Sequence, residues 1–390
     1  MNRLAMPLAS MVAVLGFLGA STPSEPPDDF QKRGEEIVAT VRDRFFDRDK
    51  AESWSKAHSR YAERARTEPD FVALTRAALS DLHASHTAYY TPDDRPYHDL
   101  LSIFRAHLKP KDVSIDSIGV DITAEGFVRV VFAGGPGEKA GLRRGDKILK
   151  AGGEAFEPVG SFRGRSGIPV SLTVQSREAE TPREVAVTPR RIDIADEWLE
   201  AQTLGAKLIE RNGKTMAYMP FFSAAGKVPQ DTLREAISDK FAKADALILD
   251  FRNGWGGADP TFLNLFDKTP PSLEQIGRGG ARTRYDRHWR KPLVVLINGG
   301  TKSGKEVVVH AIRKHKIGTL VGERTGGAVL AGSPFLLEGG LMYLAVADIL
   351  VDGKRLEGKG VAPDREVHDH LEFAEGADPQ LEIALELAAN

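Results

Sequence analysis

Apolar residues recur at helical spacing in the first part of the chain. Two stretches place them three or four positions apart, at Ile37, Val38, Val41 and Phe45 and again at Phe71, Leu74, Ala78 and Leu82. Residues spaced in this way lie on one face of an α-helix. The positions between them are rich in Arg, Asp and Glu. The pattern therefore predicts an N-terminal helical region over residues 31–110.

A second pattern begins near Ser114. Short runs of β-branched and apolar residues alternate with glycine and polar residues, at residues 118–122, 127–132, 170–174 and 184–187. Such runs, bounded by turn-forming residues, are typical of short strands. We expect a small β-rich domain over residues 114–191.

From Thr215 onward, strand-like runs alternate with helical ones. The strand-like runs are residues 216–219, 246–250, 293–297 and 319–321, and the helical ones are residues 232–244 and 307–312. This alternation predicts an α/β core with a mainly parallel sheet and flanking helices over residues 200–390. Asp378 and Pro379 supply an N-cap and a first-turn proline for a closing helix.

The N-terminus has the pattern of an export signal. Arg3 precedes an uncharged apolar run over residues 4–20, and residues 21–30 form a polar, proline-rich linker. A positive charge, a short apolar run and a small residue before a polar break predict a signal peptide over residues 1–20, cleaved after Ala20. We therefore expect an exported protein, periplasmic or secreted. An uncleaved membrane anchor is the alternative, because the run is near the lower limit of a spanning helix.

Composition removes several classes of function. The 390 residues are 41% hydrophobic and 28% charged, which is the balance of a globular protein, and the length favours two or three domains. A net charge of −2 gives no basic footprint for nucleic acid. The absence of cysteine excludes disulfides, a thiolate nucleophile and cysteine-ligated metal centres. We expect no cofactor and no metal site.

Three segments contain residues suited to catalysis. Residues 81–87 include the pair Ser85-His86 directly after a predicted helix. Residues 247–257 form a buried strand that enters a glycine-rich loop, where backbone N–H groups can point at a ligand. Residues 293–306 lead from a second buried strand to Ser303, at the start of a predicted helix. The carboxyl ends of such strands are where α/β sheets place their sites.

The third segment also fits a phosphate-binding loop in part. Gly299, Gly304 and Lys305 have the spacing G-x-x-x-x-G-K between a strand and a helix. The next residue is Glu306, where that motif needs Ser or Thr to hold Mg²⁺ and where a carboxylate would repel phosphates. We therefore disfavour a nucleotide-binding protein.

The β-rich region resembles a PDZ domain. Residues 134–149 contain a short helix ending in Ala-Gly-Leu, then Gly145, Asp146 and a strand, as PDZ domains do. The resemblance implies that the loop of Ile118, Gly119 and Val120 holds the C-terminal carboxylate of a peptide, which would add to the sheet edge as a strand.

The chain as a whole resembles the C-terminal-processing and tricorn-type serine peptidases. Four ordered motifs carry this resemblance: D-x-R-x-x-x-G-G at Asp250, Arg252, Gly256 and Gly257; T-x-S-x-x-E at Thr301, Ser303 and Glu306; G-E-x-T-x-G at Gly322, Glu323, Thr325 and Gly327; and E-x-x-G-V-x-P-D at Glu357, Gly360, Val361, Pro363 and Asp364. The family pairs an α/β core with a PDZ domain and a helical N-terminal part. The resemblance implies that Ser303 is the nucleophile.

Two positions depart from the processing branch of this family. Its catalytic lysine would fall at Ala328, and its usual asparagine in the strand–loop motif is Gly254 here. The tricorn-like branch instead uses a Ser-His pair and a closing glutamate, which match Ser85, His86 and Glu357. An imidazole with a pKa near 6.5 can take the proton of a serine hydroxyl.

The resemblance implies a role for each of these side chains. His86 would be the general base, and Ser85 backed by Glu357 would hold its other ring nitrogen. Ser85 can do so only if the chain bends, because successive side chains on a strand face opposite ways. Backbone N–H groups of Gly304 and of the turn Gly256–Gly257 would form the oxyanion hole. We expect Lys302 and Lys305, at the start of a helix, to be solvated.

The sequence thus predicts an exported serine endopeptidase that hydrolyses polypeptide substrates recognised at their C-termini. No nucleic acid is expected as a partner, and a membrane only if the N-terminal segment is retained. The alternative is a catalytically inactive relative that binds peptides as an adaptor, which the absence of a lysine at Ala328 favours. Retention of both His86 and Ser303 argues against that alternative.

Overall fold

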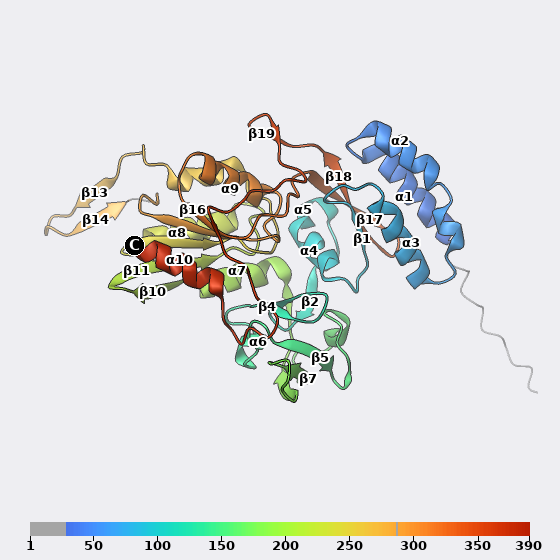
Figure 1. The fold of residues 1–390 in the computed structure, drawn as a ribbon, viewed down its shortest axis with the longest axis horizontal. Helices are drawn as coiled ribbons and strands as arrows, with labels where there is room; N and C mark the ends of the chain where they lie inside the picture. Colours follow the sequence, from blue (N-terminus) through green and yellow to red (C-terminus); the bar gives the residue numbers. More distant parts are fainter. Residues whose placement is uncertain (1–28, 286–287) are drawn as a thin grey trace, which may run out of the picture.

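The computed structural model describes residues 29–285 and 288–390. The predicted signal peptide, residues 1–20, and most of the linker, residues 21–30, lie outside the described residues. Figure 1 shows three parts: a group of helices from the N-terminal third, a small β-rich module and an α/β core. Among the described residues, no helix has the length and apolar character needed to cross a membrane.

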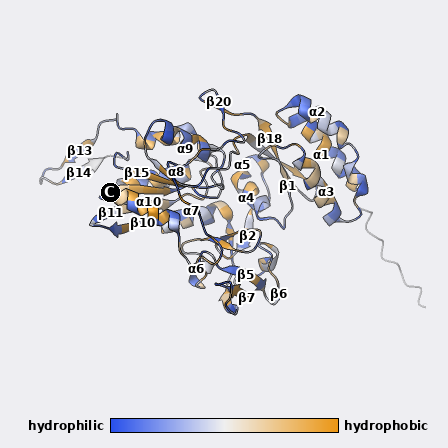
Figure 2. Cartoon of the chain, viewed as in Figure 1, coloured by the Kyte–Doolittle hydropathy of each residue, from blue (hydrophilic) through white to orange (hydrophobic). Residues whose placement is uncertain are grey.

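The core is a six-stranded sheet between helices. Its spatial order is β10 (Lys207–Arg211), β11 (Lys214–Pro220), β12 (Ala246–Asp250), β15 (Leu293–Ile297), β16 (Thr319–Gly322) and β21 (Arg365–Glu366). Because successive strand residues face opposite ways, Leu247 and Leu249 pack on one face of the sheet and Ile248 on the other. Figure 2 shows the buried strands and α10 mostly in the hydrophobic colour.

Different helices cover the two faces. The face with Leu247 packs against α8 (Val228–Ser238), η3 (Pro260–Phe266) and α9 (Gly304–Lys314). The opposite face packs against α10 (Pro379–Ala389). Asp378 caps α10 by accepting from Leu381 N at 3.0 Å, as the sequence predicted.

The sheet is mixed, which corrects the expectation of a mainly parallel one. Strands β11, β12, β15, β16 and β21 pair in parallel, but β10 pairs antiparallel with β11. The cause is local. Asn212 and Gly213 both have positive φ, +54° and +74°, which is the two-residue turn that joins antiparallel neighbours.

The N-terminal helices share a core with strands from the C-terminal half. Helices α1 (Phe30–Arg44), α2 (Arg48–Ala57) and α3 (Glu68–Ser80) lead to β1 (Ala88–Tyr90). Strand β1 pairs antiparallel with β18 (Gly340–Ala347), which pairs with β17 (Ala331–Leu337). Apolar residues of these strands and helices form one buried cluster. This pairing places the segment just before β1 next to residues more than 240 positions later. Helices α4 (Arg95–Ile103) and α5 (Arg105–Leu108) follow β1.

The β-rich module consists of short strands, the helical turn α6 and a 3-10 turn, η2 (Gly160–Phe162). They are β2 (Ser114–Ser117), β3 (Val120–Ile122), β4 (Val128–Val131), α6 (Pro136–Lys139), β5 (Lys147–Ala151), β6 (Glu154–Ala155), β7 (Val170–Gln175), β8 (Arg183–Val187) and β9 (Arg190–Asp193). Four of them form a sheet in the order β6-β5-β7-β8, while β2 pairs with β9 and β3 with β4. Helix α7 (Ile194–Gly205) then leads into the core. Two further hairpins, β13 (Leu273–Ile276) with β14 (Arg282–Tyr285) and β19 (Leu350–Val351) with β20 (Lys354–Arg355), extend from the core.

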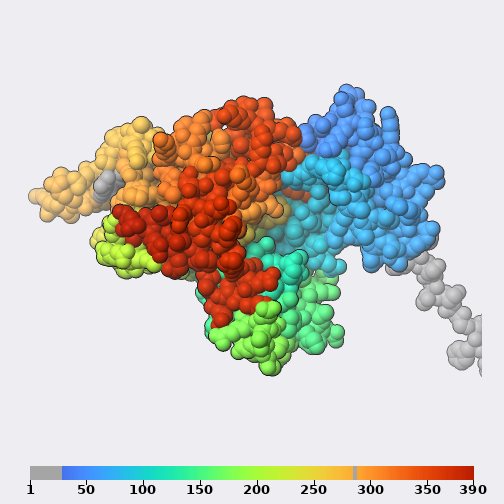
Figure 3. Space-filling view, viewed as in Figure 1, coloured from blue at the N-terminus to red at the C-terminus, as the bar shows by residue number. Residues whose placement is uncertain are grey.

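A C-terminal strap, residues 367–378, ties the module to the core. It runs from β21 to α10 and reaches the module, as the red segment in Figure 3 shows. Phe373 N donates to Gly145 O at 3.0 Å, and the Arg144 guanidinium pairs with Asp369 at 2.5 Å. Gly145 has φ of +90°, and a Cβ there would lie 2.2 Å from Ala374 N. The strap therefore fits only against a glycine.

We expect Gly145→Ala to lower the free energy of unfolding by about 1–3 kcal/mol more than Gly152→Ala, because it adds a clash to the backbone strain. Gly152 is the matched control, with φ of +62° and no atom within 4 Å of its built Cβ. Urea unfolding of the two variants measures the difference. Equal losses would show that the strap does not press on Gly145.

Candidate active site

A cavity of about 380 Å³ lies between the core, the module and the N-terminal helices. Its lining includes Ser85, His86, Gly256 and Ser303, which come from segments far apart in the sequence. Gly254, Lys302, Ala328 and Tyr343 also face it. Four of the residues predicted for catalysis and oxyanion binding are thus brought to one cavity. A larger cavity of about 510 Å³ adjoins it and shares Arg129 and Asn253 with its lining.

Ser303 stands at a strained turn between β15 and α9. Its φ is +58°, a conformation that costs a non-glycine residue about 1–3 kcal/mol and needs support from its surroundings. Ser303 N donates to Ala328 O at 2.7 Å. Two residues earlier, Thr301 Oγ1 donates to Phe251 O at 3.0 Å, which ties the turn to the end of β12. These bonds hold Ser303 half-buried at the wall of the cavity.

Glu306 holds the same turn from within. Its side chain is completely buried and accepts from Ser303 N at 3.3 Å, Thr325 Oγ1 at 2.6 Å and the N–H groups of Gly327 and Ala328, each at 2.8 Å. Burial raises the pKa of Glu306, while these hydrogen bonds act in the opposite direction. Both oxygens of this carboxylate thus accept hydrogen bonds from groups within the protein. The sequence motif contained Glu306, but its positioning role was missed; a glutamate three residues after a helix-capping serine was the available signal.

His86 is oriented by Ser85 and Glu357. Ser85 Oγ donates to Glu357 Oε2 at 2.9 Å and lies 3.0 Å from His86 Nδ1. Because the single hydroxyl proton goes to the carboxylate, Oγ accepts from Nδ1–H. This leaves the lone pair of the neutral imidazole on Nε2. The bend that such a contact needs is present, since His86 has φ of +55°.

Glu357 is itself fixed by backbone groups. Its carboxylate accepts from Ser85 N at 3.1 Å, Val329 N at 2.7 Å and Leu330 N at 3.2 Å. The charge therefore has a defined position behind Ser85. It joins the segment before β1 to the segment before β17.

Burial lowers the pKa of His86 to about 4, well below the value near 6.5 of a solvated imidazole. Glu357 acts against this shift and Lys302 adds to it. The Tyr343 ring lies 5.4 Å from the imidazole, centroid to centroid, and forms part of the apolar surroundings. At neutral pH the imidazole is neutral and able to accept a proton.

Glycine backbone is closely packed at Gly256 beside Ser303 and at the neighbouring Gly257 and Gly304. A Cβ on Gly256 would lie 2.6 Å from Ser303 Cβ, and one on Gly304 would lie 2.2 Å from Ala258 O. Gly257 has φ of +91°, and a Cβ at this position would lie 2.6 Å from Ala225 Cα. Gly304 begins α9, so its N–H has no partner within the helix and lies at the positive end of the helix dipole.

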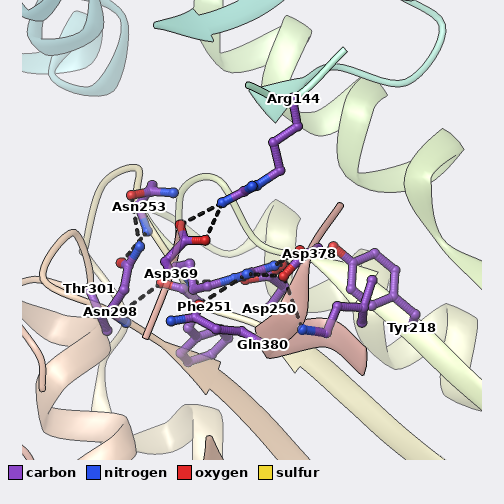
Figure 4. A network of polar contacts seen from close by, with 12 residues as sticks. Arg144, Tyr218, Asp250, Phe251, Asn253, Asn298, Thr301, Asp369, Asp378 and Gln380 are labelled. Atoms are coloured by element: carbon purple, nitrogen blue, oxygen red, sulfur yellow. Dashed lines mark hydrogen bonds and ion pairs between the residues drawn. The ribbon is translucent and has the colours of Figure 1, made fainter. Parts of the chain in front are cut away.

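The loop 253–257 rests on a buried ion-pair network, shown in Figure 4. Arg252 pairs with Asp250 at 2.6 Å and with Asp378 at 2.7 Å, and donates to Gln380 at 3.1 Å. Tyr218 Oη donates to Asp250 at 2.9 Å. The motif residues Asp250 and Arg252 therefore anchor the loop to the start of α10. Sequence reasoning assigned no such role to Asp378.

Gly254 departs from the asparagine of related motifs for a visible reason. Its φ is +70°, and its built Cβ would lie 1.9 Å from Phe222 O. Only glycine fits so close to that carbonyl.

The predicted peptide-binding residues do not line this cavity. Ile118, Gly119 and Val120 are buried in the module, directly before Asp121, which does line it. Gly119 N donates to Ser117 Oγ at 3.0 Å, so this N–H is already occupied.

The two lysines beside Ser303 differ from each other. Lys302 is exposed at the edge of the cavity, as expected. Lys305 is completely buried, so the expectation of a solvated side chain was wrong. The reason is that its position in the first turn of α9 faces the end of the sheet. Among the described residues no group of three or more His, Asp or Glu side chains is arranged to hold a metal ion.

Part of the chain matches a known family of proteins. The sequence model described as "Peptidase family S41" matches residues 217–367, which span β12, Ser303, Glu306 and Glu357. Residues 217–367 are thus similar to peptidase family S41. The S41 segment contains Ser303 and Glu357, whereas His86 comes from outside it.

Relatives of the S41 segment have names that refer to peptidases. The chain is 28% identical over 276 residues to the "Carboxyl-terminal-processing protease" of Synechocystis sp. This alignment covers 66% of this chain and 63% of the relative. It is 29% identical over 399 aligned positions to the "Tricorn protease homolog 1" of Streptomyces coelicolor, covering 93% of this chain and 35% of the relative. The chain thus matches less than two thirds of the length of these relatives.

A solved structure shares the S41 fold. The "Photosystem II D1 C-terminal processing protease" aligns with 90% of this chain and 98% of its own, with a TM-score of 0.52 and 22% sequence identity. At this identity the likeness shows the fold alone.

We expect the His86 imidazole to titrate with a midpoint near pH 4 in the folded protein. Burial disfavours the charged form, so the ring takes up its proton only well below the usual value. NMR of the protein with labelled histidine measures the midpoint, and the spectrum of His86→Gln assigns the signal. A midpoint between pH 6 and 7 would contradict the burial of the ring.

Proposed function

We propose that this chain is a serine endopeptidase that hydrolyses peptide bonds of polypeptide substrates, with Ser303 as nucleophile and His86 as general base. One observation carries the proposal. A cavity lined by Ser303 and His86 also has the imidazole oriented from behind by Ser85 and Glu357. The peptidase family of residues 217–367 and the names of the relatives support the same activity.

The geometry supports a proton relay in which His86 accepts and then returns one proton. His86 Nε2 takes the proton of Ser303 Oγ as the oxygen attacks the substrate carbonyl carbon, which opens the C=O bond to an oxyanion. The imidazolium then gives that proton to the leaving amine as the C–N bond breaks. Water attacks the acyl-enzyme by the same route, releases the carboxylic acid and restores Ser303.

Two charges act on the imidazolium as it forms. The charge of Glu357 raises the pKa of His86, and the negative oxyanion raises it further once the carbonyl has been attacked. A base with a low pKa in the empty cavity therefore becomes a better proton acceptor during the reaction than before it.

The oxyanion is assigned to the N–H of Gly304 and one N–H of the turn Gly256–Gly257. Gly256 lies against Ser303, Gly304 follows it, and the close packing of the glycine backbone supports a fixed position for these groups. Losing one such donor typically costs about 3–4 kcal/mol of transition-state stabilisation.

We expect Ser303→Ala and His86→Ala each to lose about 10³-fold or more in kcat/KM on a peptide substrate, since each removes a member of the catalytic pair. A fluorophosphonate probe, which reacts with activated serines, should label the unaltered protein and neither variant. Lys302→Ala is the control and should keep more than about a tenth of the activity. A folded His86→Ala variant with near-normal turnover would contradict the assignment of the base.

No observation in the candidate site favours the alternative of a catalytically inactive, peptide-binding adaptor. It was considered because Ala328 stands where a lysine base would be. Ala328 instead lines the cavity and donates its N–H to Glu306, beside the Ser303 turn.

We further propose that residues 31–110, 114–191 and 200–390 are the functional units and that residues 114–191 act as a PDZ-like domain that binds substrate C-termini near Ile118, Gly119 and Val120. The order of short strands around α6 supports this proposal, while the bond from Gly119 N to Ser117 means that the loop must open to accept a carboxylate. Export directed by residues 1–20 is part of the same proposal.

Peptides with a free C-terminal carboxylate should bind at least tenfold more tightly than the same peptides with a C-terminal amide, because only the former offer a charge to backbone N–H groups. Calorimetry with Ser303→Ala, which cannot consume the peptide, measures both affinities. Equal affinities would rule out recognition of the carboxylate.

A further inference from the structure

Lys305 is buried two residues after the nucleophile. Its side chain has no exposed surface, and Nζ donates to Phe221 O at 2.5 Å, Asn253 O at 2.9 Å and Phe251 O at 3.5 Å. The ammonium also lies 5.8 Å from the centroid of the Phe251 ring. One side chain from α9 thus reaches the carboxyl ends of both β11 and β12.

The ammonium has no carboxylate partner. Other buried cations do: Arg33 pairs with Glu68, and Arg252 pairs with Asp250 and Asp378. Within residues 29–285 and 288–390, Lys305 forms no ion pair and relies on backbone oxygens. Burying a charge without a counter-ion costs free energy unless every N–H group donates a hydrogen bond. Here three carbonyl oxygens match the three N–H donors of the ammonium.

The three carbonyls belong to the two segments that shape the oxyanion hole. Asn253 begins the loop 253–257. This loop contacts the segment after Phe221, because Trp255 N donates to Phe222 O at 2.8 Å. The loop held in this way places Gly256 against Ser303. Lys305 therefore connects the helix that carries the nucleophile to the loop that carries the donors.

We propose that Lys305 is a positioning residue whose ammonium, by donating to the carbonyls of Phe221, Phe251 and Asn253, holds the loop 253–257 in the arrangement that stabilises the oxyanion. This inference rests on the proposed function of Ser303. It assigns to Lys305 a role different from that of a general base.

Geometry separates these two roles. A lysine base needs an unprotonated nitrogen that faces the serine hydroxyl. Lys305 does not line the cavity that contains Ser303 and His86, and its nitrogen points to carbonyl oxygens.

The protonation state of Lys305 provides the test. Burial lowers its pKa to about 7, and the charge of Asp250 at the end of β12 acts in the opposite direction. The other ionisable groups at the same ends of the elements around it are Tyr218 on β11, Arg252 after β12, Asp259 before η3, and Lys302 and Glu306 beside it in the sequence.

The sign of the pH dependence follows from the number of protons. Raising the pH through about 7 leaves a neutral amine with two protons for three carbonyls, so one contact and the charge are lost. The loop then loosens and activity falls. A general base would show the opposite, because only the neutral amine can accept a proton and activity would rise with pH.

The first experiment measures kcat and KM for a small activated ester between pH 5 and 9. For the unaltered protein we expect kcat to fall with an apparent pKa of about 7–8, with KM changed less than about threefold. Lys305→Met should have a kcat at least tenfold lower at pH 6 and no alkaline decline. Lys291→Met is the matched control, because Lys291 also donates to two backbone carbonyls, those of Ala242 and Ala244, but far from the cavity.

The second experiment needs no activity. Hydrogen–deuterium exchange of the loop 253–257, corrected for intrinsic rates, should be several-fold faster at pH 8 than at pH 6 in the unaltered protein and in Lys291→Met. In Lys305→Met it should be fast at both pH values. This readout separates the two proposals: a protein that hydrolyses no ester but shows the pH-dependent exchange refutes the peptidase and keeps the positioning role.

Three results would overturn the inference. They are activity that rises through pH 7, activity that is flat from pH 6 to 9, or exchange in the loop that does not depend on pH. If Lys305→Met does not fold, the profile and exchange of the unaltered protein still decide the matter, because their direction with pH differs between the two roles.

Discussion

The buried carboxylate of Glu306 is the constraint on which the site depends. It collects N–H groups from Ser303, Gly327 and Ala328 together with the Thr325 hydroxyl. Without it, donors that water cannot reach would lose their acceptor, at about 1–3 kcal/mol each. These hydrogen bonds maintain the positive φ of Ser303. They also hold Ala328, and the next residue, Val329, donates its N–H to Glu357. The turn at Ser303 and the segment that donates to Glu357 are therefore both tied to the buried Glu306 carboxylate.

The site is assembled from three distant parts of the chain. Ser85 and His86 precede β1, Ser303 begins α9, and Glu357 follows β20. The pairing of β1 with β18 brings the first and last of these together, and the network of Arg252 and Asp378 fixes the loop opposite them. Ser303 caps α9, and hydrogen bonds hold Ser85, His86 and Glu357 in the turns before β1 and after β20, so the imidazole is oriented within the protein itself.

The local pattern of residues was sufficient to predict some of the helices, strands and caps of this structure. The helices near Ile37 and Phe71, the buried strands β12 and β15, and the cap at Asp378 follow from spacing and capping rules that act within a few residues. The pairing of β1 with β18 was not foreseen, because contacts over about 250 positions leave no local trace. The burial of Lys305 and the low pKa of His86 depend on which neighbours surround them, which periodicity does not report. The hairpin at Asn212 and Gly213 was within reach of the sequence, since this dipeptide is a turn signal.

The strap has a consequence for how the molecule is made. Glu357, the strap and α10 follow Ser303 in the chain, so during synthesis they leave the ribosome after Ser303 does. Until they arrive, the Arg252 side chain lacks Asp378, one face of the sheet lacks its covering helix, and Ser85 lacks its carboxylate partner. Under the proposed function, a nascent chain carries Ser303 before it carries the surroundings that would make that serine reactive. The order of translation would then delay the onset of the proposed catalysis.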